Sequence, residues 1–119
     1  MAQHAKKPAT YADIEALAPN LVGEIVAGEL LVHPRPAMPH ALALGRIGGR
    51  LDSLFGLGDG GPGGWWILPE PELHLGADVL VPDIAGWRRA RMPVLPETAF
   101  FALAPDWVCE VLSESTEVA

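Results

Sequence analysis

The sequence predicts a single domain of the α+β (α/β) class, in which helices pack against a mixed β-sheet. Hydrophobic residues make up 50% of its 119 residues, which is enough for one core. Short apolar runs bounded by glycine and proline predict strands, and one longer segment with apolar residues at helical spacing predicts a helix. We expect the domain to occupy residues 1–119, with residues 1–9 as a loose N-terminal arm.

A short helix and a hairpin are expected first. Thr10 opens a pattern that resembles a capping box, which predicts a helix over residues 11–18. Residues 23–26 and 29–32 are two apolar runs separated by an Ala-Gly pair, and this predicts a β-hairpin with Gly28 in the turn.

A long helix is expected next, because Pro39 is acceptable at a first helical position. The apolar residues that recur at helical spacing are Leu44, Ile47, Leu51, Leu54 and Phe55. Three glycines in this segment lower helix propensity, and we expect them to allow a close approach to the sheet. The remaining elements are predicted as strands at 65–68, 72–75, 79–87 and 107–112, with a helical turn at 98–103.

Charge and cysteine content limit the classes of function. The formal net charge of -7 argues against a large sequence-independent contact with nucleic acid, although acidic metal sites contribute negative charge of their own. The basic cluster at Arg88, Arg89 and Arg91 is either a solvated loop or a contact to phosphate. No apolar run reaches the roughly 18 residues of a membrane span, so no membrane partner is expected. A lone cysteine, Cys109, fits a reducing cytoplasm, which is the expected location.

Two acidic residues interrupt apolar, strand-like runs. Asp83 follows Pro82 in one run, and Glu110 follows Cys109 in another. Charged side chains avoid such places unless they are paired, hydrogen-bonded or bound to a metal. Two carboxylates on neighbouring strands would form a site for a hard cation, and that chemistry fits phosphodiester cleavage. The alternatives are that Asp83 only turns the chain after the proline and that Glu110 faces solvent at a sheet edge.

Three segments carry a family resemblance. GEIVAGELLVHPRP, LVPDIAGW and PDWVCEVLSEST, in this order, resemble the Uma-two family of restriction-endonuclease-like proteins, within the PD-(D/E)xK nuclease group. The resemblance implies a restriction-endonuclease-like core and a Mg²⁺-dependent DNA endonuclease. Such an enzyme is a hydrolase, and Mn²⁺ can replace Mg²⁺ as its cofactor. It implies that Asp83 and Glu110 are catalytic and bind the metal, and that Glu24 lies near them. His40 matches a histidine common in the family.

The chain departs from the family pattern at the lysine. In the simplest pattern the lysine stands two residues after the glutamate, where this chain has Leu112, and no lysine follows Lys7. The C-terminal elements of the family fold and the catalytic lysine are therefore expected to be missing, so the sequence leaves open whether this chain is active or inactive.

Two other classes of function remain open. The first is a non-catalytic remnant or protein-interaction domain that keeps the nuclease-like fold, with a homodimer through an uncovered strand as one form of it. The second is a metal-binding module that uses His33, His40 and His74, although their separations follow no zinc-ligand spacing.

Overall fold

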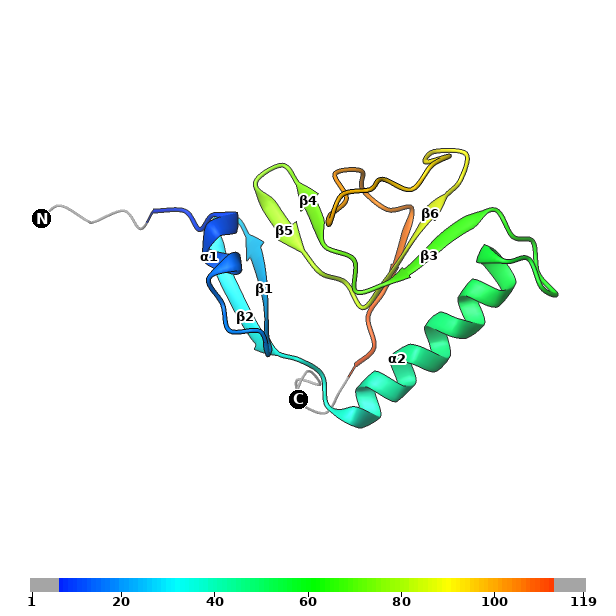
Figure 1. The fold of residues 1–119 in the computed structure, drawn as a ribbon, viewed down its shortest axis with the longest axis horizontal. Helices are drawn as coiled ribbons and strands as arrows, with labels where there is room; N and C mark the ends of the chain where they lie inside the picture. Colours follow the sequence, from blue (N-terminus) through cyan, green and yellow to red (C-terminus); the bar gives the residue numbers. More distant parts are fainter. Residues whose placement is uncertain (1–6, 113–119) are drawn as a thin grey trace, which may run out of the picture.

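The computed structural model describes residues 7–112, and its strands form two antiparallel sheets (Figure 1). The first sheet has the strand order β2-β1-β5-β4, with β1 at Leu21–Val26, β2 at Glu29–Pro34, β4 at Leu73–Leu75 and β5 at Asp78–Leu80. The second has the order β3-β6-β7, with β3 at Trp65–Pro69, β6 at Ile84–Arg88 and β7 at Trp107–Cys109. The helices are α1 at Tyr11–Glu15 and α2 at Met38–Leu51, and a π-helical turn, η1, continues α2 at Asp52–Gly56.

The predicted α+β class is confirmed, but the single mixed sheet is not found. Every strand pair within the two sheets is antiparallel, and the parallel pairing in the described part is one isolated bridge between Leu73 and Phe101. The segment 98–103 contains no helical turn. Residues 98–100 form a bend, and Phe101 then lies beside β4, where its N–H donates to the Glu72 carbonyl and the His74 N–H donates to its carbonyl.

The predicted hairpin is present and its strands are longer than expected. β1 and β2 pair from Leu21 opposite Pro34 to Val26 opposite Glu29. Ala27 (φ 51°) and Gly28 (φ 83°) both lie in the left-handed region, as a two-residue hairpin turn of the primed type requires.

The apolar run predicted as one strand at 79–87 is two strands in different sheets. The chain leaves the first sheet after β5, passes Pro82 and enters the second sheet as β6. Proline has no N–H to donate to a ladder, so the run breaks there. Asp83 consequently lies at the point where the chain crosses from one sheet to the other.

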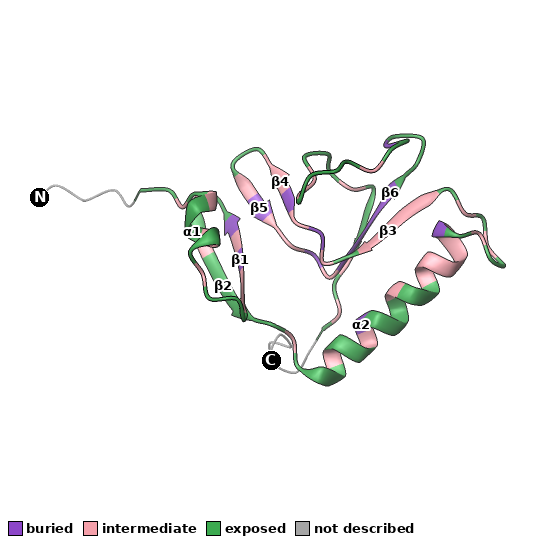
Figure 2. Ribbon diagram, in the orientation of Figure 1, coloured by how far each residue is buried: buried purple, intermediate pink, exposed green. Residues whose placement is uncertain are grey.

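The core is centred on β6, the most buried strand, as Figure 2 shows. Ile84, Ala85 and Trp87 are fully buried, and the Trp87 ring stacks on Phe101 with 4.5 Å between ring centroids. Helix α2 packs against β3 of this sheet and buries Leu44, while most of its surface is exposed.

The glycines of α2 do not act as expected. A methyl group at Gly48 would lie 3.9 Å from Ile84, an ordinary contact, and one at Gly45 or Gly49 would meet open space. The expectation that these three glycines permit a close helix–sheet approach is therefore wrong. Within residues 7–112, no helix has the length and apolar character needed to cross a membrane.

Candidate functional site

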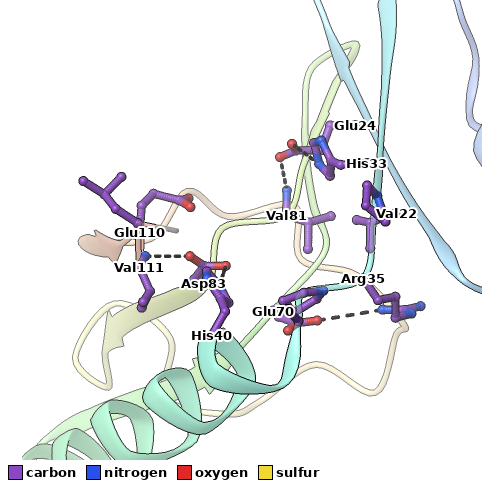
Figure 3. Close-up of a pocket in the computed structure, with 14 residues that line it drawn as sticks. Val22, Glu24, His33, Arg35, His40, Glu70, Val81, Asp83, Glu110 and Val111 are labelled. Atoms are coloured by element: carbon purple, nitrogen blue, oxygen red, sulfur yellow. Dashed lines mark hydrogen bonds and ion pairs between the residues drawn. The ribbon is translucent and has the colours of Figure 1, made fainter. Parts of the chain in front are cut away.

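Asp83 and Glu110 are brought together by the pairing of β6 and β7. Ile84 lies opposite Cys109 in this antiparallel pair, so the residue before β6 and the residue after β7 meet at the same end of the sheet. The Val111 N–H donates to Asp83 Oδ2 at 2.6 Å and fixes that carboxylate. Figure 3 shows both acidic side chains at one pocket. Both carboxylates therefore line one pocket, and their binding of a common cation stays a prediction.

The pocket has a volume of about 630 Å³, within the range of small-ligand sites. Both sheets contribute to it, with β1 and β2 on one side and the ends of β6 and β7 on the other, and the first turn of α2 adds to the wall. The ionisable residues that line it are Glu24, His33, Arg35, His40, Glu70, Asp83 and Glu110.

Glu110 carries an unusual ionisation. Although the residue as a whole is exposed, partial burial of its carboxyl group raises the pKa to about 7, and the negative charge of Asp83 adds to the rise. Glu24 contributes a weaker repulsion. A cation bound beside Glu110 and Asp83 would relieve the repulsion that raises the Glu110 pKa.

Glu24 faces the same pocket from the middle of β1. Its Oε2 accepts a hydrogen bond from the Val81 N–H at 2.7 Å, and its Oε1 lies 3.0 Å from His33 Nε2. Both oxygens are thus engaged, and the side chain is held against the chain segment that leads to Asp83. Among residues 7–112, no three His, Cys, Asp or Glu side chains are close enough together to hold one metal ion.

His40, in the first turn of α2, lies against Asp83. Its Nε2 is 3.5 Å from Asp83 Oδ1, and its Nδ1 is buried without a hydrogen-bond partner in the described part of the chain. A buried nitrogen without a partner is uncommon in proteins, which marks this ring as part of the pocket wall.

The three histidines do not form a zinc site. His33 pairs with Glu24, and His40 faces Asp83. His74 lies outside the pocket, where it pairs with Glu72 at 3.0 Å and stacks on Phe100. The histidine-based metal module is therefore contradicted by the geometry.

Two further residues of the pocket were not assigned to the site from the sequence. Glu70 lines the pocket with a φ of 47°, and its N–H donates to the Asp83 carbonyl at 2.8 Å. Arg35 follows β2 and also lines the pocket. The sequence signal that marks both is local: each stands between two prolines, which fix the backbone around it.

The basic cluster after β6 does not reach the pocket. Arg88 lies over one tryptophan ring of β3 at 5.2 Å, Arg89 lies over the next at 4.1 Å, and Arg91 pairs with Asp106 at 2.8 Å. None of the three lines the pocket. Their interpretation as phosphate contacts beside Asp83 is wrong, because each guanidinium is used in holding the strand end and the following loop.

Comparison with known proteins shows a likeness to a solved structure. No family model matches the chain, and no match was found among curated proteins. Among solved structures, a proposed nuclease of the DUF820 family from Anabaena variabilis ATCC 29413 is similar, with a TM-score of 0.71 and 22% sequence identity. The similarity covers 92% of this chain and 62% of that one, so this chain spans less than two thirds of its neighbour's length. The likeness shows that the chain has a nuclease-like α+β fold.

Proposed function

We propose that this chain is a Mg²⁺-dependent endonuclease-like domain that acts on phosphodiester bonds in DNA. The observation that carries the proposal is the meeting of Asp83 and Glu110 at one end of the β6–β7 pair, inside a pocket lined by four carboxylates. The nuclease-like fold supports it.

The donor set fits a hard cation. Asp83 and Glu110 offer carboxylate oxygens, which Mg²⁺ and Mn²⁺ prefer. Neither residue is a sulfur or imidazole ligand of the kind that favours zinc. Val111 donates to Asp83 Oδ2 and His40 Nε2 lies 3.5 Å from Oδ1, and each carboxylate oxygen keeps a second lone pair that a cation could use. When bound there, the ion would supply Lewis-acid polarisation of a phosphate oxygen and a more acidic bound water.

The residues of the chain have separate tasks around that site. Val111 orients Asp83 through its backbone N–H, and Glu24 holds the Val81 segment that precedes it. Glu110, whose pKa lies near 7, holds or releases a proton in the neutral pH range and becomes the second anionic ligand when deprotonated. His40 covers the side of Asp83 that faces α2.

Nicking of supercoiled plasmid DNA, with Mg²⁺ or Mn²⁺ and with chelator, tests the proposal. We expect metal-dependent nicking that Asp83→Asn lowers by about a hundredfold or more, since the variant removes the charge that holds the ion. The matched control is Asp59→Asn, which makes the same change of charge at an exposed loop residue outside the pocket. Equal nicking by the two variants would assign the activity to a contaminant.

A second candidate function is a protein-interaction domain that has lost catalysis. It is favoured by β7, an edge strand whose Trp107 and Val108 are 41% and 50% exposed. An exposed apolar edge of this kind can pair with a second copy of the chain. A homodimer by light scattering that Val108→Lys dissociates, together with no nicking in either metal, would favour this candidate over the enzyme.

A further inference from the structure

We infer that Arg35 is a phosphate-contacting residue of this site, placed to hold the backbone of a nucleic acid that enters the pocket. The inference rests on the proposed function. It assigns to Arg35 the positive charge that a site built mainly from acidic residues needs in order to bind a phosphate. It is independent of any residue beyond the described part of the chain.

Charge is the first reason. Arg35 is the one lysine or arginine among the described residues that line the pocket, and four carboxylates line it with Arg35. A phosphodiester carries a negative charge, so a pocket with only carboxylates would repel it at neutral pH. A divalent cation at Asp83 and Glu110 would offset part of this charge, and Arg35 would offset more. Figure 3 shows Arg35 on the side of Glu70 that is away from Asp83.

The geometry of the guanidinium is the second reason. Arg35 Nε donates to the Pro19 carbonyl at 3.3 Å, which anchors the stem of the side chain. Nη1 lies 3.8 Å from Glu70 Oε2, an ion pair too long for a hydrogen bond. Within the described residues, the N–H groups of Nη1 and Nη2 therefore make no hydrogen bond. Two parallel donors of this kind match two phosphate oxygens.

The stiffness of the backbone is the third reason. Prolines at positions 34 and 36 restrict the chain on both sides of Arg35, and its own N–H is held by the Asn20 carbonyl at 3.2 Å. A side chain on a fixed backbone loses less conformational entropy when it binds. Its partner Glu70 is held in turn by the bond from its N–H to the Asp83 carbonyl, so the arginine and the acidic pair belong to one connected wall.

Binding of a short fluorescein-labelled DNA duplex, followed by anisotropy with Ca²⁺ in place of Mg²⁺, tests the inference. Arg35→Ala should weaken binding by about tenfold or more, as expected for the loss of a charged hydrogen-bond donor. It should also lower the slope of log Kd against log salt by about one, because one phosphate contact is lost. Arg35→Lys should keep that slope and recover only part of the affinity, because it restores the charge without the fork.

Arg46→Ala is the matched control, since it removes the same charge from an exposed position on α2 outside the pocket. Equal effects of Arg35→Ala and Arg46→Ala on affinity and salt slope would overturn the inference, as would a failure of the unmodified chain to bind both the DNA duplex and an RNA duplex of the same sequence. The RNA duplex, run in parallel, shows whether the contact distinguishes DNA from RNA, and a dependence on Arg35 with either probe supports the inference.

Mn²⁺ binding, measured by electron paramagnetic resonance on the same proteins, separates this inference from the proposed function. Arg35→Ala should bind Mn²⁺ at least as well as the unmodified chain, whereas Asp83→Asn should not bind it. If Arg35→Ala binds Mn²⁺ normally and its DNA affinity is unchanged, the role of Arg35 is overturned and the proposed metal-dependent function is not. Absence of Mn²⁺ binding by the unmodified chain overturns the metal-dependent function instead.

Discussion

Asp83 and Glu110 show how a residue's setting can be predicted when its partners cannot. Each carboxylate interrupts an apolar run, and that pattern together with the family resemblance predicted the two acids in one site. The other contacts that form the wall of the pocket could not be predicted from the sequence. Nothing in the spacing of Glu24, Arg35 or Glu70 tells which strand ends meet, because those distances are set by how two sheets join.

The pH dependence of stability follows from Glu110. Its pKa rises from 4.5 to about 7 on folding, so the folded state binds the proton more tightly than the unfolded state. The stabilisation is present at low pH and is lost as the pH rises through this window. We expect a fall on the order of 1 kcal/mol between these pH values, discounted because the residue is largely solvated.

Urea denaturation of Glu110→Gln at a series of pH values checks this. The variant should lack the fall and be the more stable protein at pH 8, while Glu97→Gln, at an exposed site outside the pocket, should behave like the unmodified chain. A fall that persists in Glu110→Gln would assign it to another group.

At the scale of elements, the sequence predicted which segments are strands and helices better than it predicted their boundaries and partners. The hairpin and α2 were predicted because turn chemistry and helical spacing are local signals. The break of one apolar run into β5 and β6 was marked by Pro82, but the sheet that each half joins depends on contacts remote in sequence. The same applies to segment 98–103, where the bonds of Phe101 to the β4 segment are remote in sequence.

The attachment of α1 to β4 gives a second pH prediction. Tyr11 Oη donates to Glu72 Oε2 at 2.8 Å, and this bond, with partial burial and the charge of Glu72, raises the Tyr11 pKa to about 12. The contribution to stability is present below pH 10 and is lost as the pH rises toward 12. Because Tyr11 is the only tyrosine of the chain, titration of phenolate absorbance reports it directly. Tyr11→Phe should cost about 1 kcal/mol in urea denaturation at neutral pH, and a phenolate midpoint near 10 would contradict the bond.

The open glycines of α2 predict a stabilised variant. A methyl group at Gly49 meets nothing within 4 Å, so Gly49→Ala should raise the free energy of unfolding by about 0.5–1 kcal/mol through helix propensity alone. Gly61→Ala is the contrasting variant, because its methyl group would lie 2.5 Å from the Leu54 carbonyl oxygen. It should be destabilised, and urea denaturation of both should place them on opposite sides of the unmodified chain.

At the scale of the whole molecule, the pocket exists only where the two sheets meet. Glu24 and His33 belong to the first sheet, Asp83 and Glu110 flank strands of the second, and α2 brings His40 to the same place. A ligand of this pocket therefore contacts groups that separate when the domain unfolds. Binding to the folded state alone raises stability by mass action.

Thermal unfolding in Mn²⁺ or Mg²⁺ makes this coupling measurable. A cation at one hundred times its Kd should stabilise the domain by about 2.7 kcal/mol, and the rise in Tm should grow with metal concentration. Asp83→Ala, compared with its own metal-free Tm, should lose the rise, and Asp59→Ala should keep it, because Asp59 lies in an exposed loop away from the pocket. A rise in Tm that survives in Asp83→Ala would place the cation elsewhere on this acidic chain. No rise in Tm with either metal would contradict the enzymatic proposal, because the four carboxylates of the pocket would then lack the counter-charge on which it depends.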